Sequence, residues 1–294
     1  MIPLTVITGP TASGKTQMAI ELALKKNGEI VSADSMQIYR RMDVGTAKPS
    51  LQERAGVVHH MIDVAEPWEK YSVARYCEAT HSIIAEIHQK GKTPILTGGT
   101  GLYIDSVVNN IKYGEGEADP ALRRELCELA DKNGNGHIHE MLKSVDSESA
   151  EKIHVSDRKR IVRALEVFHT TGETMTEQKR ISRSGGSIYD AKIYAIDVPR
   201  QMLYERVNAR VDCMIERGLQ AEVRGLLESG VSPDANSMQG IGYKEMIGVI
   251  NGEKSLDRAI EEIKQNTRHY AKRQLTWFRR NPDIIWNRYE YGKE

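Results

Sequence analysis

Short apolar runs and longer segments with helical periodicity alternate along most of this chain. Apolar, largely β-branched runs predict strands at residues 4–8, 29–32, 93–97 and 191–197, with shorter candidates at 59–63 and 284–286. Between these runs, apolar residues recur at helical spacing, which predicts helices. Strands that alternate with helices are typical of an α/β fold built on a parallel sheet.

The alternation stops at residues 113–186, where helical periodicity continues and no candidate strand occurs. A polar linker at 114–118 precedes these helices, and a glycine- and serine-rich linker at 184–187 leads back to the next strand. We therefore expect a helical insertion domain at 113–186 within a core made of residues 1–112 and 187–294.

Inside the insertion, Asp119 and Pro120 predict the start of the first helix, because aspartate caps helices and proline suits the first helical position. Breaks in the helical pattern are expected only at 133–136 and at 171–172, where glycines interrupt it.

Composition describes an ordinary globular chain, with 294 residues and 41 basic against 41 acidic side chains. A net charge of zero argues against bulk attraction to nucleic acid, although it leaves room for local basic faces. Cys77, Cys127 and Cys213 stand far apart, which indicates neither a disulfide frame nor a metal site. Because no signal peptide, membrane-spanning run or obligate protein partner is evident, we expect a cytoplasmic protein.

The segment between the first strand and the first helix has the spacing of a phosphate-binding loop, glycine, four residues, glycine, lysine and threonine. The residues expected to bind phosphate are Gly9, Thr11, Ala12, Ser13, Gly14, Lys15 and Thr16. Backbone N–H groups of such a loop turn toward an anion, and the helix N-terminus adds positive potential. Lys15 supplies a mobile charge and the Thr16 hydroxyl suits Mg²⁺, so the loop is expected to bind a di- or triphosphate.

Two further segments follow predicted strands and should lie at the same edge of the sheet. Asp34 follows the second strand, and a glycine-rich segment at 98–103 follows the strand at 93–97. In an open parallel sheet, ligands bind outside the carboxyl ends of the strands, so both segments are candidate parts of the site. Asp34 is also compatible with a helix or turn cap, and the glycines with close packing alone.

Two helical segments are strongly basic. One carries Arg158, Lys159, Arg160 and Arg163, which is also the pattern of a solvated helix face. The other, at 264–280, contains Lys272 and Arg273 among further cations, with Tyr270, Trp277 and Phe278 interleaved. Basic and aromatic side chains together suit contacts with nucleic-acid phosphates and bases, although an amphipathic helix with core aromatics shows the same pattern.

These features leave three classes of function open. A small-molecule kinase uses a phosphate loop with an arginine-bearing helical lid, but the strand at 93–97 does not end in the aspartate that usually holds magnesium. A transferase could instead use the loop to hold a leaving group. A regulatory nucleotide-binding module without chemistry would leave Asp34 and the clustered arginines unexplained.

A series of blocks in fixed order gives the chain a resemblance to one family. The blocks are Gly9 to Thr16, Asp34 to Tyr39, Gly45 to Pro49, Gly98 to Tyr103, Arg163 to Val167, Gly242 to Glu245, and Ala271 to Gln274. Together they resemble the bacterial tRNA dimethylallyltransferases, from the first strand to Trp286. The resemblance implies that the five-carbon group of dimethylallyl diphosphate is transferred to the exocyclic amine of the adenosine 3′ of the tRNA anticodon. The phosphate loop then holds diphosphate with Mg²⁺, and Thr16 is the expected metal ligand.

The resemblance also implies residue roles. Asp34 matches the general base, Thr100 a hydroxyl of the reaction channel, and Arg160 and Arg210 match arginines near the leaving diphosphate. The residues expected to contact tRNA are Asp34, Ser35, Met36, Gln37, Thr100, Arg123, Lys159, Arg160, Arg163, Lys272 and Arg273. Arg158 stands where many family members have proline, so the chain departs from the family's pattern at the start of that helix. A related activity on free adenine nucleotides stays an alternative, although the basic helices favour tRNA.

Overall fold

The structure is a computed structural model that describes residues 1–113 and 119–288. It divides into two compact units, which are described separately below. One comprises Met1–Val108 with the described residues from Ser187 onward, and the other comprises the described residues of Asn109–Gly186. The linker predicted at 114–118 lies outside the described residues.

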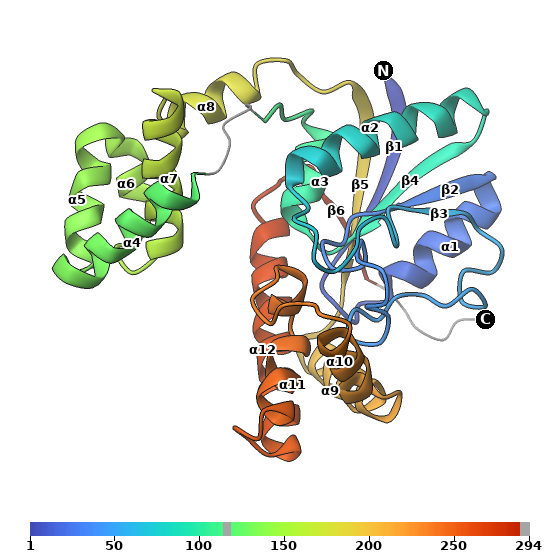
Figure 1. Cartoon of the computed structure of the whole chain (residues 1–294). Coiled ribbons are helices and arrows are strands. Elements are labelled where there is room, and N and C mark those ends of the chain that lie inside the picture. The colour runs from blue at the N-terminus through green and yellow to red at the C-terminus, as the bar shows by residue number, and fades with distance from the viewer. Residues whose placement is uncertain (114–118, 289–294) are drawn as a thin grey trace. The chain divides into compact units, whose positions relative to one another are not determined.

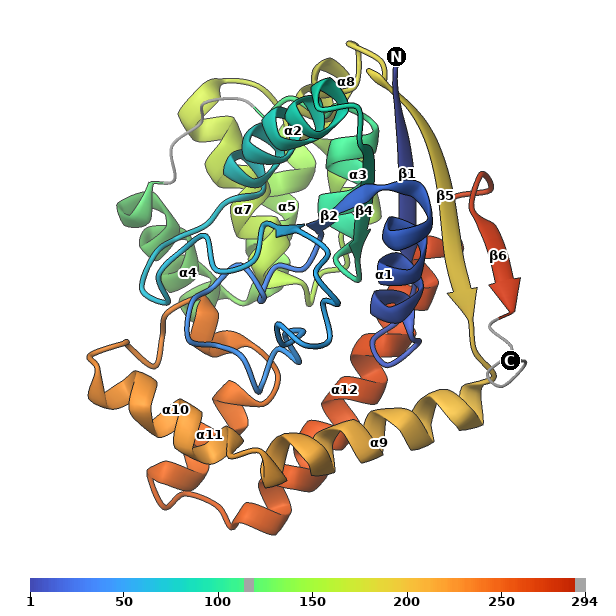
Figure 2. The ribbon, with the colours of Figure 1, turned by 90° about the vertical axis from the view of Figure 1, so that its right-hand side faces the viewer.

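The first unit is built on one parallel sheet. Its strands are β1 (Ile2–Thr8), β2 (Gly28–Ser32), β3 (His59–His60), β4 (Thr93–Gly98), β5 (Tyr189–Asp197) and β6 (Ile285–Arg288). They lie in the order β3-β2-β4-β1-β5-β6, and every neighbouring pair is parallel. β3 and β6 are thus the edge strands, and Figure 2 shows β6 beside β5. The predicted α/β fold with a parallel sheet is therefore confirmed, including both short strands.

Helices cover both faces of this sheet (Figure 1). Successive residues of a buried strand point to opposite sides, so both faces of the sheet present apolar side chains to the helices. Leu4 and Val6 of β1 pack in one apolar cluster with residues of α2 (Val73–Gln89) and α3 (Gly101–Val108). Ile7 packs in another with α1 (Lys15–Lys26). Ser72 caps α2, where its side chain accepts a hydrogen bond from the Arg75 N–H.

A second apolar core lies beyond the sheet. It is formed by helices α9 (Arg200–Glu216), α10 (Leu219–Glu228), α11 (Tyr243–Ile250) and the start of α12 (Leu256–Phe278), with a 3₁₀ turn at Ser237–Gln239. These helices are visible below the sheet in Figure 2. Ile38, Tyr39 and Met42, from the segment after β2, are buried in the same cluster. This helical platform therefore holds the segment that leaves β2 next to Asp34.

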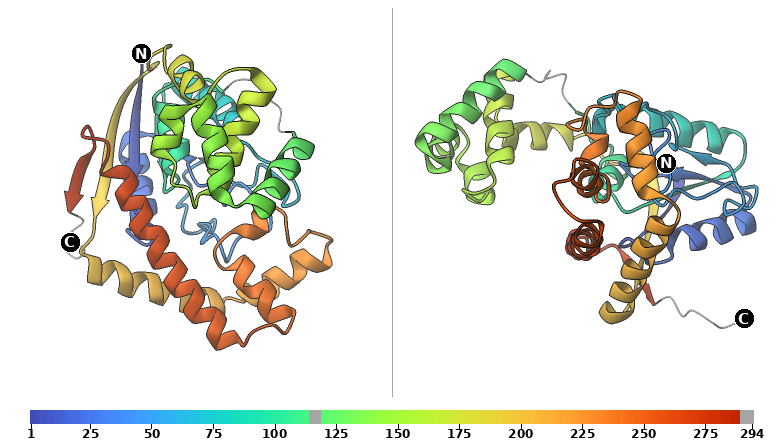
Figure 3. Two further views of the ribbon diagram at one scale, coloured as in Figure 1. Left: turned by 90° about the vertical axis from the view of Figure 1, so that its left-hand side faces the viewer. Right: turned by 60° about the horizontal axis from the view of Figure 1, so that its bottom comes forward.

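The second unit is a bundle of short helices (Figure 3). They are α4 (Pro120–Asn133), α5 (Asn135–Val145), α6 (Ser147–Lys152), α7 (Arg158–Thr171) and α8 (Met175–Ser182). As predicted, the Asp119 side chain caps α4. Two further breaks in the helical pattern, after Val145 and after Lys152, were not predicted. Asp146 caps α6. After Lys152 the chain is non-helical up to Asp157, which caps α7. Helix α7 thus begins at Arg158 without the family's proline.

Within the described residues, no helix combines the length and the apolar character needed to cross a membrane.

Candidate active site

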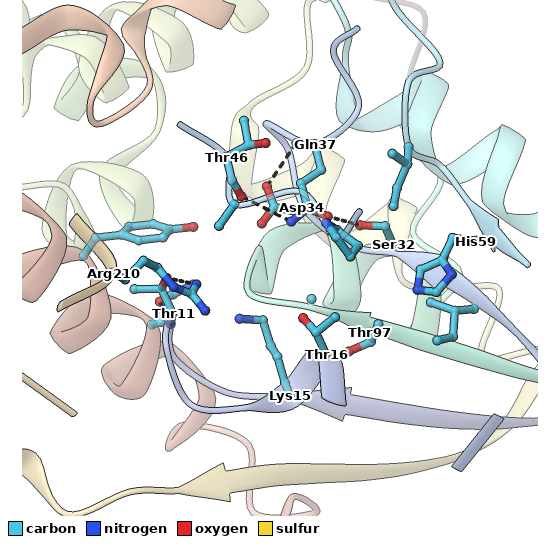
Figure 4. A pocket seen from close by; sticks show the side chains of 17 residues that line it. Thr11, Lys15, Thr16, Ser32, Asp34, Gln37, Thr46, His59, Thr97 and Arg210 are labelled. Atoms are coloured by element: carbon cyan, nitrogen blue, oxygen red, sulfur yellow. Dashed lines mark hydrogen bonds between the residues drawn. The ribbon is translucent and has the colours of Figure 1, made fainter. Parts of the chain in front are cut away.

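The carboxyl ends of β1, β2 and β4 open into one pocket of about 640 Å³, a volume that includes solvent at its mouth. Figure 4 shows Lys15 and Thr16 on one side of it, with Asp34, Gln37 and Thr46 facing them. The further lining residues are Thr11, Ile30, Ser32, Ala47, Pro49, His59, Ile62, Thr97, Gly98, Arg210, Tyr270 and Gln274. The site predicted at this edge therefore brings Asp34 and the phosphate loop into one pocket.

The phosphate loop adopts a conformation that only a few residue types tolerate well. Gly9 (φ 148°) and Gly14 (φ 93°) have positive φ, and Ala12 lies in the left-handed region at φ 63°. Gly14 precedes α1 without a side-chain cap, so the first N–H groups of the helix are left for an anion. The Ser13 hydroxyl is buried and has no hydrogen-bond partner among the described residues.

Lys15 lies between two charges of opposite sign. Burial lowers the pKa of Lys15 to about 8; the positive charge of Arg210 also lowers it, and the Asp34 carboxylate opposes both. Arg210 donates a hydrogen bond from Nη1 to Thr11 Oγ1 over 3.3 Å, which brings α9 onto the phosphate loop. Two cations and one carboxylate thus face the same pocket.

The two oxygens of Asp34 have different surroundings. Oδ1 accepts hydrogen bonds from the N–H groups of Met36 (2.9 Å) and Gln37 (3.3 Å), so the cap interpretation is correct for this oxygen. No hydrogen bond to Oδ2 is recorded among residues 1–113 and 119–288. The side chain is therefore oriented through one oxygen, while the other is available in the pocket.

The remaining residues predicted around Asp34 do not all line the pocket. Thr100 Oγ1 accepts a hydrogen bond from the Ser35 N–H over 3.1 Å, which ties the segment after β2 to the start of α3. Gln37 lines the pocket and donates from Nε2 to the Thr46 carbonyl over 3.3 Å. Met36 packs partly buried against the helical platform.

Two residues of α12, Tyr270 and Gln274, line the pocket, which the sequence did not indicate for either. Gln274 is buried; its Oε1 accepts from the Thr11 N–H over 2.8 Å, and its Nε2 donates to the Gly99 carbonyl over 2.9 Å. It therefore joins the phosphate loop to the turn after β4. Burial, together with the charge of Asp34, raises the pKa of Tyr270 to about 12, so this phenol stays protonated at neutral pH.

The aromatic residues interleaved in α12 face inward. Phe278 is buried in the sheet core, and Trp277 donates from Nε1 to Asp105 Oδ2 over 2.8 Å. The core alternative therefore holds for Trp277 and Phe278, whereas Tyr270 lines the pocket. Lys272 and Arg273 are exposed, and the Arg273 guanidinium lies 5.7 Å from the centre of the Tyr270 ring.

The two glycines at the end of β4, Gly98 and Gly99, serve close packing. A Cβ on Gly98 would lie 2.1 Å from the carbonyl oxygen of Ala33, and one on Gly99 would lie 2.2 Å from Gln274 Nε2. The packing alternative therefore accounts for both positions. It also explains how the ends of β2 and β4 come close enough to share one pocket.

His59 is a further pocket residue that carried no signal in the sequence. Its Nδ1 lies 2.9 Å from the Val57 carbonyl, which can only accept, so Nδ1 carries the proton. Nε2 is buried without a hydrogen-bond partner in the described structure, and burial lowers the pKa of the ring. A neutral histidine thus closes the end of the pocket opposite Arg210 (Figure 4).

Three of the predicted basic residues of the helical unit, Arg123, Arg160 and Arg163, take part in ion pairs. Arg123 and Arg163 both bind the fully buried carboxylate of Glu166, at 2.8 and 2.9 Å. Burial would raise the pKa of Glu166, but the hydrogen bonds from the two arginines outweigh it and lower the pKa. Lys159 and Arg160 are exposed, and Arg160 pairs with Asp157 at 3.4 Å.

Arg158 differs from its neighbours on α7. It binds Asp131 Oδ1 at 2.7 Å and also donates to the Cys127 carbonyl, so it joins α7 to α4.

Comparisons with known proteins agree along nearly the whole chain. Residues 37–281 match the sequence model of the family described as IPP transferase. A tRNA dimethylallyltransferase of Acetivibrio thermocellus is 46% identical over 290 residues, which cover 98% of this chain and 93% of that protein. Among solved structures, the full-length tRNA isopentenylpyrophosphate transferase of Bacillus halodurans is 41% identical with a TM-score of 0.73, covering 98% of this chain and 90% of that one. A eukaryotic dimethylallyltransferase acting on tRNA has a TM-score of 0.81 at 30% identity, covering 97% and 74%. The resemblance inferred from the ordered blocks is confirmed, and the chain belongs to the IPP transferase family.

Proposed function

We propose that this protein transfers the dimethylallyl group of dimethylallyl diphosphate to the exocyclic amine of the adenosine next to the tRNA anticodon, releasing diphosphate. The observation that carries the proposal is the pocket in which the Asp34 carboxylate faces Lys15 and the phosphate loop. A carboxylate suits removal of a proton from an amine, and the loop suits a diphosphate leaving group. The tRNA-modifying relatives favour this activity over a kinase or an enzyme of free adenine nucleotides.

At the phosphate end, the chain offers cations and N–H donors to the leaving group. When the allylic C–O bond breaks, its electron pair goes to the diphosphate oxygen. Lys15, Arg210 and the N–H groups at the start of α1 then stabilise the growing negative charge. These groups are in place before the reaction, so little reorganisation is needed.

Mg²⁺ fits this end of the pocket as a companion of the diphosphate. The described residues contain no group of three His, Cys, Asp or Glu side chains that could form a protein cage for a metal. Mg²⁺ commonly binds through substrate phosphates and waters with only one or two protein ligands, and the Thr16 hydroxyl is the expected one. When bound, the ion would neutralise charge on the departing diphosphate.

At the acceptor end, Asp34 acts as the general base. The amine nitrogen forms a bond to the allylic carbon and loses a proton, which moves to Asp34 Oδ2. The hydrogen bonds from Met36 and Gln37 to Oδ1 keep the carboxylate directed into the pocket. The adenosine reaches this position only when it leaves its stack, which is easiest in an unpaired loop.

Exposed cations supply the wider tRNA contact. The residues proposed for it are Arg123, Lys159, Arg160, Arg163, Lys272 and Arg273, with Ser35, Met36, Gln37 and Thr100 near the adenosine. Among them, Arg160 is proposed to act on the leaving diphosphate as well.

The test uses labelled dimethylallyl diphosphate with unmodified tRNA, with and without ATP. We expect transfer of label to tRNA without ATP, and no transfer to AMP or ATP. Asp34→Asn should abolish most of the transfer, whereas Asp190→Asn, an exposed position on β5, should leave it unchanged. Label on free adenine nucleotides would indicate the related activity, and ATP-dependent phosphorylation would indicate a kinase.

A further inference from the structure

The Glu222 carboxylate on α10 holds a segment of chain more than 170 residues earlier. Its Oε2 accepts hydrogen bonds from the N–H groups of Asp43 (2.8 Å) and Val44 (2.7 Å). Its Oε1 accepts from the Gly45 N–H (3.0 Å) and from the Tyr243 hydroxyl (2.7 Å). One carboxylate thus accepts hydrogen bonds from three consecutive backbone N–H groups and from a phenol. Hydrogen bonds to a carboxylate are stronger than hydrogen bonds between neutral groups.

The same segment is fixed by packing and by a buried lysine. A Cβ on Gly45 would lie 2.5 Å from the Tyr243 ring, so the backbone rests directly on that ring. Lys48 is buried, and its Nζ binds Asp43 Oδ1 at 2.5 Å and Asp63 Oδ1 at 2.6 Å. Residues 43–48 therefore have little freedom while Glu222 is in place.

This segment forms one wall of the pocket. Thr46, Ala47 and Pro49 line it, and the Thr46 carbonyl accepts the hydrogen bond from Gln37 Nε2 at 3.3 Å. Gln37 also lines the pocket, and its N–H binds Asp34 Oδ1. The contacts run from Glu222 through Gly45 and Thr46 to the two residues at the acceptor end.

We propose that Glu222 is a positioning residue for the RNA side of the reaction, acting through residues 43–46 on Gln37 and Asp34. The inference rests on the function proposed above, because it assigns the Gln37 side of the pocket to the adenosine. Removal of the carboxylate leaves three backbone N–H groups without their acceptor. Residues 43–45 then move until these groups can donate to water. The phosphate loop has no contact with Glu222 among the interactions described here, so its ligand affinity should be preserved.

The main experiment compares Glu222→Ala with Glu228→Ala, an exposed glutamate on the same helix. We expect Glu222→Ala to lower kcat/KM for tRNA by about 10- to 100-fold, because shifts near 1 Å have such effects. Its Kd for dimethylallyl diphosphate should stay within about twofold of the wild type, since that ligand is assigned to the other end. Glu228→Ala should match the wild type in both.

A double-mutant cycle distinguishes positioning from general destabilisation. If Glu222 acts through Gln37, Glu222→Ala should lose much of its effect in a Gln37→Ala background, whereas independent effects would multiply. Glu222→Gln should retain an intermediate rate, because its amide oxygen still accepts from Asp43 and Val44. Tyr243→Phe removes one hydrogen bond and keeps the ring under Gly45, so it gives the same test if Glu222→Ala fails to fold.

The outcomes distinguish a failure of the proposed function from a failure of the positioning role of Glu222. A wild-type protein that transfers no label to tRNA would overturn the proposed function. An active wild type with Glu222→Ala, Glu222→Gln and Tyr243→Phe equal to Glu228→Ala would overturn the positioning role alone. Multiplicative effects of Glu222→Ala and Gln37→Ala, or a matching loss of diphosphate affinity, would overturn it as well.

Discussion

The protonation state of Lys15 should control how tightly the free protein binds dimethylallyl diphosphate. Burial, with help from the charge of Arg210 and against the charge of Asp34, lowers the pKa of this side chain to about 8. The ammonium form attracts the diphosphate and the neutral amine does not. Raising the pH from 7 to 9 should therefore weaken binding although the fold stays intact.

The size of the effect follows from the pKa. If only the ammonium form binds, the apparent Kd is about 1.1 times its limiting value at pH 7 and about 11 times at pH 9. The expected loss of affinity is thus about tenfold. The ligand contributes little to this change, because phosphate groups complete their ionisation near pH 6.

The assay is a direct binding titration of dimethylallyl diphosphate without tRNA, at constant ionic strength and pH 7, 8 and 9. Lys15→Arg is the matched control, because a guanidinium stays protonated throughout and its affinity should not change with pH. A wild-type affinity that is constant from pH 7 to 9 would refute the reasoning. An equal loss in Lys15→Arg would assign the titration to another group.

The same pKa predicts a trend in stability with a definite sign. The unfolded chain holds the Lys15 proton up to the ordinary pKa of 10.5, while the folded chain releases it near 8. The unfolded state therefore binds more protons between pH 8 and 10.5, and Lys15 makes unfolding more costly as the pH rises through that window. Below pH 8 the buried charge opposes folding, so Lys15→Met should raise the melting temperature of the ligand-free protein at pH 7.

Further predictions concern the base and the cations. Asp34→Asn should lower single-turnover transfer by about 10²- to 10⁴-fold, with tRNA affinity measured by filter binding almost unchanged. Replacing Lys272 and Arg273 together by glutamine should reduce the slope of log Kd for tRNA against log salt by about one to two, and an unchanged slope would contradict the assignment. Arg160→Ala should lower transfer at saturating substrates, whereas Arg158→Ala should lower the melting temperature because it breaks the pair with Asp131. Equal transfer rates for these two variants would show that Arg160 takes no part in the chemical step.

The parts of the fold that depend on neighbouring residues could be predicted from the sequence. The buried strands, the glycine-rich turn between β1 and α1, and the Asp119 cap each rest on a pattern within a few residues, and the structure has all three. Asp34 could be placed as well, because the carboxyl ends of parallel strands share one edge of the sheet. The breaks after Val145 and Lys152 were missed, since Asp146 and Asp157 are also ordinary in helix interiors and loops.

The parts that depend on contacts across the chain gave no usable signal. Gln274 binds the Thr11 N–H across 263 residues, and Glu222 binds the Gly45 N–H across 177. A glutamine on a basic helix and a glutamate on an amphipathic one are compatible with many roles. Only the packing of α10 against residues 43–45, and of α12 against the loop between β1 and α1, gives these two side chains their partners, and that packing is a property of the whole fold.

Helix α12 shows why its sequence supported two interpretations at once. Tyr270 and Gln274 line the pocket, while Lys272 and Arg273 are exposed. A helix that carries both basic and aromatic side chains fits a nucleic-acid contact and a core helix equally well, and here different side chains of one helix have different partners. Under the proposed function, Arg273 contacts RNA while the next residue, Gln274, holds the Thr11 N–H of the phosphate loop. Because Arg273 and Gln274 belong to one rigid helix, that helix sets both the position of the RNA and the shape of the diphosphate site.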